Sequence, residues 1–190
     1  MQHRLRHPIT DFRILKTVLI FFLAYAILLI LWWQAREAYT YGLTFVASKV
    51  VAELKDAQLE KVTKENDIVM AYFHSSKGGR DLSVALPVKM DVYVSNLPLT
   101  LAMLASLYPF IRKRQRAYTE ALLVLLLFHF SYIFFWEAMQ MTTLFMAKGI
   151  EGQSLTRLSL YHFLWGASNY ASVSFVPFLV VTYIFIRFRR

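Results

Sequence analysis

Long apolar stretches dominate the pattern of hydrophobic and polar residues along this chain. Residues 17–35, 92–111 and 158–186 carry no charged side chain, and residues 117–136 carry only Glu120, one turn after their start. A bilayer core about 30 Å thick requires about 20 helical residues. Buried helices of a soluble protein explain one such stretch but not four. The pattern therefore predicts four transmembrane helices.

The sizeable polar part of the chain lies between the first two apolar stretches. Over residues 37–59, apolar side chains such as Leu43, Val46 and Val50 recur at helical spacing between charged ones. This half predicts a helix that can continue the first membrane helix beyond the bilayer.

The second half of the same segment changes to a strand pattern. Residues 67–74 and 82–88 are rich in strand-forming side chains, with Lys77-Gly78-Gly79-Arg80 between them. Glycine tolerates positive φ, so this is a plausible hairpin turn, and residues 60–64 could supply a third strand. The predicted fold class is a mainly α-helical membrane protein with a small outward α+β segment, a helix plus a β-hairpin. About 55 residues are too few for a strong core, so we expect the hairpin to lean on the helix, the bilayer or a partner.

The placement of lysine and arginine predicts the orientation. With Glu120 counted inside the membrane, the segments before the first, between the second and third, and after the fourth stretch hold eleven basic residues and one acid. Residues 36–91 hold eight of each. By the positive-inside rule, the first three segments are cytoplasmic and residues 36–91 face outward. We therefore expect a multi-pass inner-membrane protein with both termini in the cytoplasm.

The predicted organisation follows from these assignments. It comprises a cytoplasmic tail (1–16), helix 1 (17–35), an extracytoplasmic segment (36–91), helix 2 (92–111), a basic cytoplasmic loop (112–116), helix 3 (117–138), an extracytoplasmic loop (139–157), helix 4 (158–186) and a cytoplasmic tail (187–190).

Composition narrows the function classes. Hydrophobic residues make up 57% of the chain and charged residues 17%, against about 45–50% and about 25% in soluble domains. The absence of cysteine excludes disulfides, thiolate metal sites and a cysteine nucleophile. The net charge of +9 sits beside the apolar stretches, as membrane topology requires. No recognised nucleic-acid-binding motif occurs, so we expect no nucleic-acid partner.

Polar side chains inside the predicted membrane helices are the candidates for chemistry. The third and fourth helices run antiparallel through a short loop, so Glu137 could face His162 near the outer surface and His129 could face Asn169 at mid-depth. A Glu–His pair can act as acid and base. Hydrogen bonding between helices, or simple exposure at the wet interface, explains the same residues without catalysis.

The pattern predicts no cofactor and no metal. Haem ligation by two histidines requires both rings at one depth, but His129 and His162 are expected to differ by about 10 Å, from the helical rise of about 1.5 Å per residue. The spacing of histidines that binds zinc is also missing from the membrane segments.

Two further motifs concern architecture. Small or polar residues at helical spacing let helices approach closely, and the partner can be a helix of this chain or of another protein. They are Gly166, Ala167, Ser168, Asn169, Ala171 and Ser172. A basic cluster fits topological anchoring and can also bind anionic lipid. It consists of Arg112, Lys113, Arg114 and Arg116.

The layout as a whole resembles a known family. One helix leads to a short outward segment that ends in a strand, and residues 88–104, VKMDVYVSNLPLTLAML, then enter a membrane helix through a Leu-Pro-Leu step. This resembles the small membrane proteins associated with exosortases, in particular the exosortase H-associated type. The resemblance implies an accessory role in bacterial protein sorting at the inner membrane and no enzymatic activity. Exosortases resemble cysteine transpeptidases, so this cysteine-free chain is not the sortase by that mechanism.

The leading hypothesis is a non-enzymatic accessory or scaffold subunit of an inner-membrane complex. Its expected partners are the lipid bilayer and another membrane protein or a second copy of the chain. The alternative is a small membrane enzyme that uses Glu137, His162 and His129 near the outer face. A small transporter or channel is a third reading, but four helices need oligomerisation to form most pores.

Overall fold

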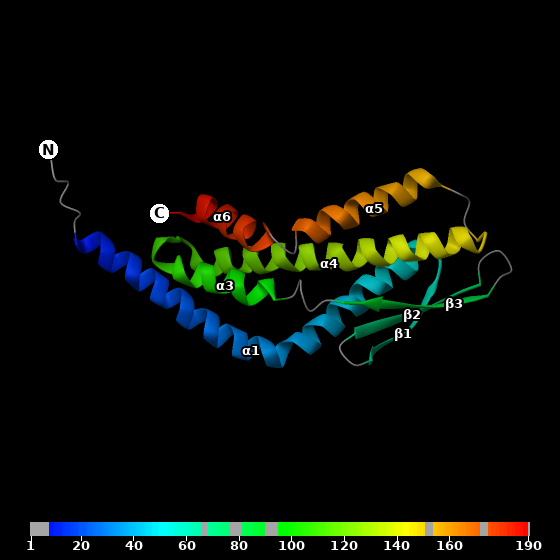
Figure 1. Ribbon diagram of the computed structural model, residues 1–190, viewed down its shortest axis with the longest axis horizontal. Helices are drawn as coiled ribbons and strands as arrows, with labels where there is room; N and C mark the ends of the chain where they lie inside the picture. The colour runs from blue at the N-terminus through cyan, green and yellow to red at the C-terminus, as the bar shows by residue number, and fades with distance from the viewer. Residues whose placement is uncertain are drawn as a thin grey trace.

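The computed structural model describes residues 8–65, 68–76, 81–89, 95–150, 154–171 and 175–189, with the backbone alone for residues 8–13. The predicted turn at residues 77–80 and Ser172 lie outside these ranges. The chain is mainly helical with one small antiparallel sheet (Figure 1). The elements are α1 (Pro8–Leu54), β1 (Gln58–Glu65), β2 (Ile68–Ser75), β3 (Leu82–Val88), α3 (Asn96–Ser106), the 3-10 helix η2 (Tyr108–Phe110), α4 (Arg114–Ala147), α5 (Leu155–Tyr170) and α6 (Val176–Phe188).

Helix α1 joins the first apolar stretch to the polar segment, as the sequence predicted. Its 47 residues extend for about 70 Å at the usual helical rise, and the helix changes direction midway (Figure 1). It ends at Leu54 rather than near residue 59. Asp56 adopts a φ of 49°, and this left-handed conformation turns the chain into β1.

The two halves of α1 meet different surroundings. The most apolar 18-residue window of this helix has no buried residue. In the second half a regular stripe is buried against α4 and the sheet. It consists of Leu43, Thr44, Ala47, Ser48, Val51 and Ala52, and Lys55 just beyond the helix is buried as well.

Helix α4 is the central element of the molecule. In Figure 1 it follows the long axis, with α5 and α6 end to end along one side and α1 on the other, and the contacts between these helices agree. The predicted fourth membrane helix, residues 158–186, is split into α5 and α6. Pro177 stands in the first turn of α6, where its missing N–H and its ring do not disturb a helix.

Two of the described helices, α1 from Ile14 and α4, are long and apolar enough to cross a membrane. The other apolar helices are shorter, because α3 has 11 residues and α6 has 13. The structure therefore identifies two candidate spans directly, rather than the four that the hydropathy pattern predicts.

The sheet has the order β1-β2-β3, and both pairings are antiparallel. The predicted hairpin and the third strand are thus confirmed. Alternate side chains of β2, including Val69, Ala71 and Phe73, are buried with Val51 of α1 and Phe145 of α4 in one apolar cluster. The small sheet therefore gains its core from the two long helices, as expected for so short a segment.

Candidate functional site: a buried polar seam and an interfacial groove

Two polar pairs join α1 to α4. The Ser48 hydroxyl donates to Glu137 Oε1 over 2.7 Å, and both side chains are fully buried. Closer to the N-terminus of both helices, the Tyr39 hydroxyl lies 2.8 Å from His129 Nδ1. We call these four residues the polar seam.

Helical geometry explains why the seam contains two pairs at two levels. Tyr39 and Ser48 are nine residues apart on α1, and His129 and Glu137 are eight apart on α4. Both separations correspond to about 12–14 Å along a helix. The two helices run in the same direction here, so both pairs can form together.

The structure places the predicted acid–base candidates differently from the sequence hypothesis. Glu137 faces α1 through Ser48, whereas His162 lies on an exposed face of α5. His129 is fully buried and meets Tyr39 at 2.8 Å. Sequence reasoning missed Tyr39 and Ser48 because both lie beyond the first apolar stretch. The available signal was the apolar stripe of α1, which places Ser48 beside Ala47 on the buried face.

The seam is suited to holding two helices together. Glu137 Oε2 is buried and has no hydrogen-bond partner among the described residues, so the hydrogen bond from Ser48 to Oε1 is the interaction that satisfies part of this carboxyl group. No set of three or more His, Asp or Glu side chains in the described ranges could hold a metal ion. The clearest role of the four residues is to fix the register of α1 on α4.

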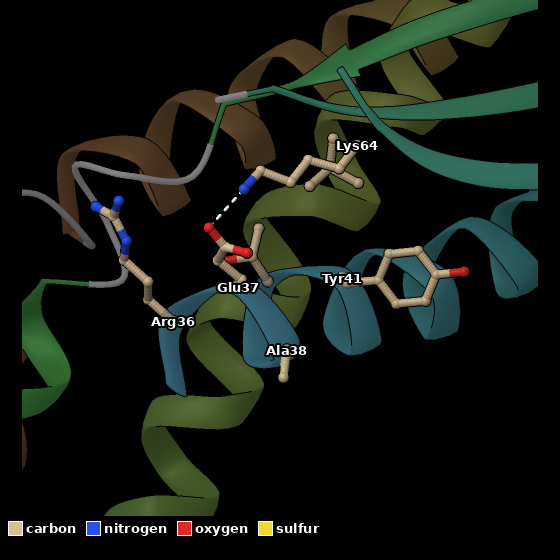
Figure 2. A pocket seen from close by; sticks show the side chains of 7 residues that line it. Arg36, Glu37, Ala38, Tyr41 and Lys64 are labelled. Atoms are coloured by element: carbon tan, nitrogen blue, oxygen red, sulfur yellow. Dashed lines mark hydrogen bonds and ion pairs between the residues drawn. The ribbon is translucent and has the colours of Figure 1, made fainter. Parts of the chain in front are cut away.

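A shallow groove of about 280 Å³ lies between α1 and the near edge of the sheet (Figure 2). The Lys64 ammonium spans it and contacts Glu37 Oε1 at 2.5 Å. The Arg36 guanidinium stacks over the Trp33 ring at 4.6 Å. Tyr41 and Val69 complete its apolar wall. We call it the interfacial groove, because it begins where the uncharged stretch of α1 ends.

A phenol–carboxylate pair joins β1 and β2, the two strands that contribute to the groove. Tyr72 of β2 donates to Glu65 of β1, and this hydrogen bond raises the pKa of Tyr72 above its usual value. The raised pKa keeps the Tyr72 phenol a hydrogen-bond donor to higher pH than an ordinary tyrosine.

The small-residue segment has mixed surroundings. Ala171 packs against the apolar cluster shared by α3, α4 and α6, whereas Ala167 is exposed and Ser168 and Asn169 are half-buried. A side chain added at Gly166 would meet no atom within 4 Å, and the same is true of Gly42 on α1. Both glycines thus mark helix faces with room for a neighbour.

The predicted basic cluster is joined by a second segment. The Arg112 backbone N–H donates to the Phe188 carbonyl over 2.7 Å, which brings the end of α6 beside the start of α4. Glu120 forms ion pairs with Arg116 at 2.9 Å and with Arg187 at 3.1 Å. Arg114 stacks over Tyr108 at 3.7 Å, so this end of the molecule is strongly basic.

Comparison with known proteins adds one finding. A family model described as exosortase H-associated membrane protein matches residues 11–180. The matched range contains almost all of α1, the sheet, α3, α4 and α5. Neither a curated protein nor a solved structure matches the sequence significantly.

Proposed function

Because this chain belongs to the exosortase H-associated membrane proteins, we propose that it is an accessory or scaffold subunit of an inner-membrane complex for exosortase-type protein sorting, without a catalytic site of its own. The family match over residues 11–180 is the observation that carries this proposal. It agrees with the resemblance predicted from the layout. Because the chain has no cysteine to act as a nucleophile, we assign the sorting chemistry to the partner.

The proposal includes the topology predicted from the sequence. Helices α1 and α4 are long enough to cross a bilayer. Helices α3 and α6 rise only about 17 Å and about 20 Å, so each needs its flanking residues to complete a crossing. The basic residues around Arg112 and Arg187 gather at one end of the molecule, which supports a cytoplasmic position for that end. We assign these residues to topological anchoring, and the same cluster can bind anionic lipid headgroups.

The partner surface that we propose runs along α1 and α4. An apolar groove of about 520 Å³ between them is lined by Ala38, Gly42, Val46, Leu126, Leu127 and Phe130. Small residues four apart, such as Ala38 and Gly42, let a second helix approach closely. We therefore assign this surface to a membrane helix of the partner.

The extent of this surface favours a protein over lipid. The apolar stripe continues from Val46 through Val50 to Leu54, which are 52%, 40% and 51% exposed. Lys49 and Glu53 flank the stripe and are exposed as well. Covering this stripe with acyl chains would bring hydrocarbon against two charged side chains, which is costly. A partner helix that continues beyond the bilayer can cover it, and can also pair with both charges.

The test is affinity purification of the tagged chain from its native host in mild detergent, followed by mass spectrometry. We expect a stoichiometric exosortase-type membrane protein. Gly42→Leu should reduce its recovery about tenfold, since overpacking a contact costs about 1–3 kcal/mol and each 1.4 kcal/mol is about a factor of ten.

Gly166→Leu is the matched control, because an added side chain meets open space at both glycines in the isolated chain. If the Gly42→Leu chain recovers as much partner as the Gly166→Leu control, α1 is not part of the interface. The subunit role would remain intact. Recovery of the wild-type chain alone, or of a homo-oligomer alone, would contradict the proposal.

A further inference from the structure

The interfacial groove has a charge pattern that the subunit role does not use. Arg36 and Lys64 are cationic and Glu37 is anionic, so the three side chains leave one positive charge. The Lys64–Glu37 ion pair is solvent-accessible, with side chains 42% and 57% exposed. Figure 2 shows Arg36 beside this pair, with no interaction drawn to the other lining residues. One monoanionic ligand would neutralise the groove.

Arg36 is held in a position suited to a phosphate. Its guanidinium lies 4.6 Å from the centre of the Trp33 ring, and this cation–π contact orients the planar group without using its N–H donors. Guanidinium groups bind phosphate oxygens through two parallel hydrogen bonds. Lys64 can add a second cation from the opposite wall by exchanging Glu37 for the ligand.

The surface that leads away from the groove is apolar. Toward the N-terminus of α1, Trp33 lies four residues from Glu37 and Ile30 lies seven residues from it, so these three side chains share one face of the helix. Trp33 is 71% exposed and Ile30 is 65% exposed. A charged groove therefore adjoins a long uncovered hydrocarbon surface, with an indole ring at the boundary where such rings favour the membrane interface.

We propose that the interfacial groove binds the phosphodiester headgroup of a phospholipid in the outward-facing leaflet. The phosphate lies between Arg36 and Lys64, and the acyl chains follow Trp33 and Ile30 along α1. Glu37 then becomes free to accept from a headgroup amine or hydroxyl. The leaflet assignment rests on the topology given under Proposed function, whereas the ligand class rests on the groove itself.

The experiment is native mass spectrometry of the full chain released from detergent, titrated with phosphatidylethanolamine or phosphatidylglycerol. A parallel titration uses soluble glycerol 3-phosphate. We expect discrete lipid adducts and no glycerol 3-phosphate adduct at equal concentration. Arg36→Gln and Lys64→Gln should each lower the lipid-bound fraction about tenfold, as expected for loss of a charge-assisted hydrogen bond.

The matched control is Lys61→Gln, which removes an exposed cation of β1 that does not line the groove. It should retain groove binding within about twofold. Arg36→Lys keeps the charge but loses the planar fork, so it should fall between wild type and Arg36→Gln. Gel filtration and thermal unfolding establish that each variant is folded, since Arg36 and Lys64 lie outside the buried core.

Unchanged binding in both groove variants, or an equal loss in the control, would overturn the proposal. Equal binding of glycerol 3-phosphate would overturn its lipid part. Partner recovery from the native host is an independent measurement. A subunit that recovers its partner but shows no groove-dependent adduct rejects the lipid site alone, and the reverse result rejects the subunit role alone.

Discussion

The two halves of α1 are one continuous helix built for two different solvents. In the first half, large apolar side chains such as Leu19 and Ile30 are 67% and 65% exposed. In the second half, Ala47 and Val51 are completely buried while Lys49 and Glu53 face out. From Val18 to Trp33 the helix is apolar on every side, whereas the exposed faces of the second half carry both apolar and charged side chains.

This difference shows where the folding energy of the chain resides. Apolar surface that faces lipid gains nothing further from burial against protein, because lipid tails are as apolar as leucine. The second half of α1 packs against the sheet and the end of α4 as in a water-soluble protein. There, each Å² of apolar surface removed from water contributes about 25 cal/mol to the free energy of folding. Substitutions of equal size should therefore have unequal effects in the two halves.

The largest expected effect separates the two regions directly. Phe73→Ala removes a fully buried ring from the cluster formed by the sheet, α1 and α4. It should lower the free energy of unfolding by about 3–5 kcal/mol, from the lost transfer energy and the cavity. Phe22→Ala is the matched control, since Phe22 is 62% exposed on the first half of α1. Thermal or denaturant unfolding in one detergent measures both, and equal losses would contradict the division.

A smaller effect should come from the polar seam, which lies where the two regions meet. Ser48→Ala removes the donor that Glu137 Oε1 accepts from and leaves a buried carboxyl group less satisfied. We expect a loss of about 1–3 kcal/mol in the free energy of unfolding. Glu137→Gln keeps an acceptor oxygen for Ser48 and should cost less than Ser48→Ala.

A double-mutant cycle for this pair uses Ser48→Ala, Glu137→Leu and the variant that carries both changes, because each single change must remove the hydrogen bond. A coupling energy near zero would show that the hydrogen bond does not stabilise the α1–α4 contact. Ser159→Ala on the exposed face of α5 is a suitable control, and we expect it to change stability by less than about 0.5 kcal/mol.

Sequence patterns predicted the local structure of this chain more successfully than its long-range contacts. The change from helical to alternating periodicity located all three strands, and the polar part of α1 was predicted as a continuation of the membrane helix. The helix end at Leu54 was missed, because the left-handed conformation of Asp56 has no strong signal in a residue other than glycine.

The helix partners were harder to predict. A short loop suggested α5 as the partner of Glu137, whereas the structure pairs Glu137 with Ser48, 89 residues away. Hydropathy treats every polar side chain in a membrane helix alike and does not specify which neighbour satisfies it. Only the buried stripe of α1, read together with the apolar face of α4, contains that information.

The smallest expected effect concerns the basic end of the molecule, where α4 begins and α6 ends, far from the sheet. Glu120 is ion-paired with Arg116 and Arg187, and its side chain is 20% exposed while theirs are 60% and 47% exposed. Such accessible pairs contribute about 0–1 kcal/mol, so Glu120→Gln should lower the unfolding free energy by less than about 1 kcal/mol. The difference from wild type should shrink as salt rises from about 0.05 M to about 0.5 M, because the screening length falls. Phe73→Ala should show no such salt dependence, since it removes no charge. A loss above about 2 kcal/mol for Glu120→Gln would mean that this end is held together as strongly as the sheet cluster, and that the comparison between the two regions fails.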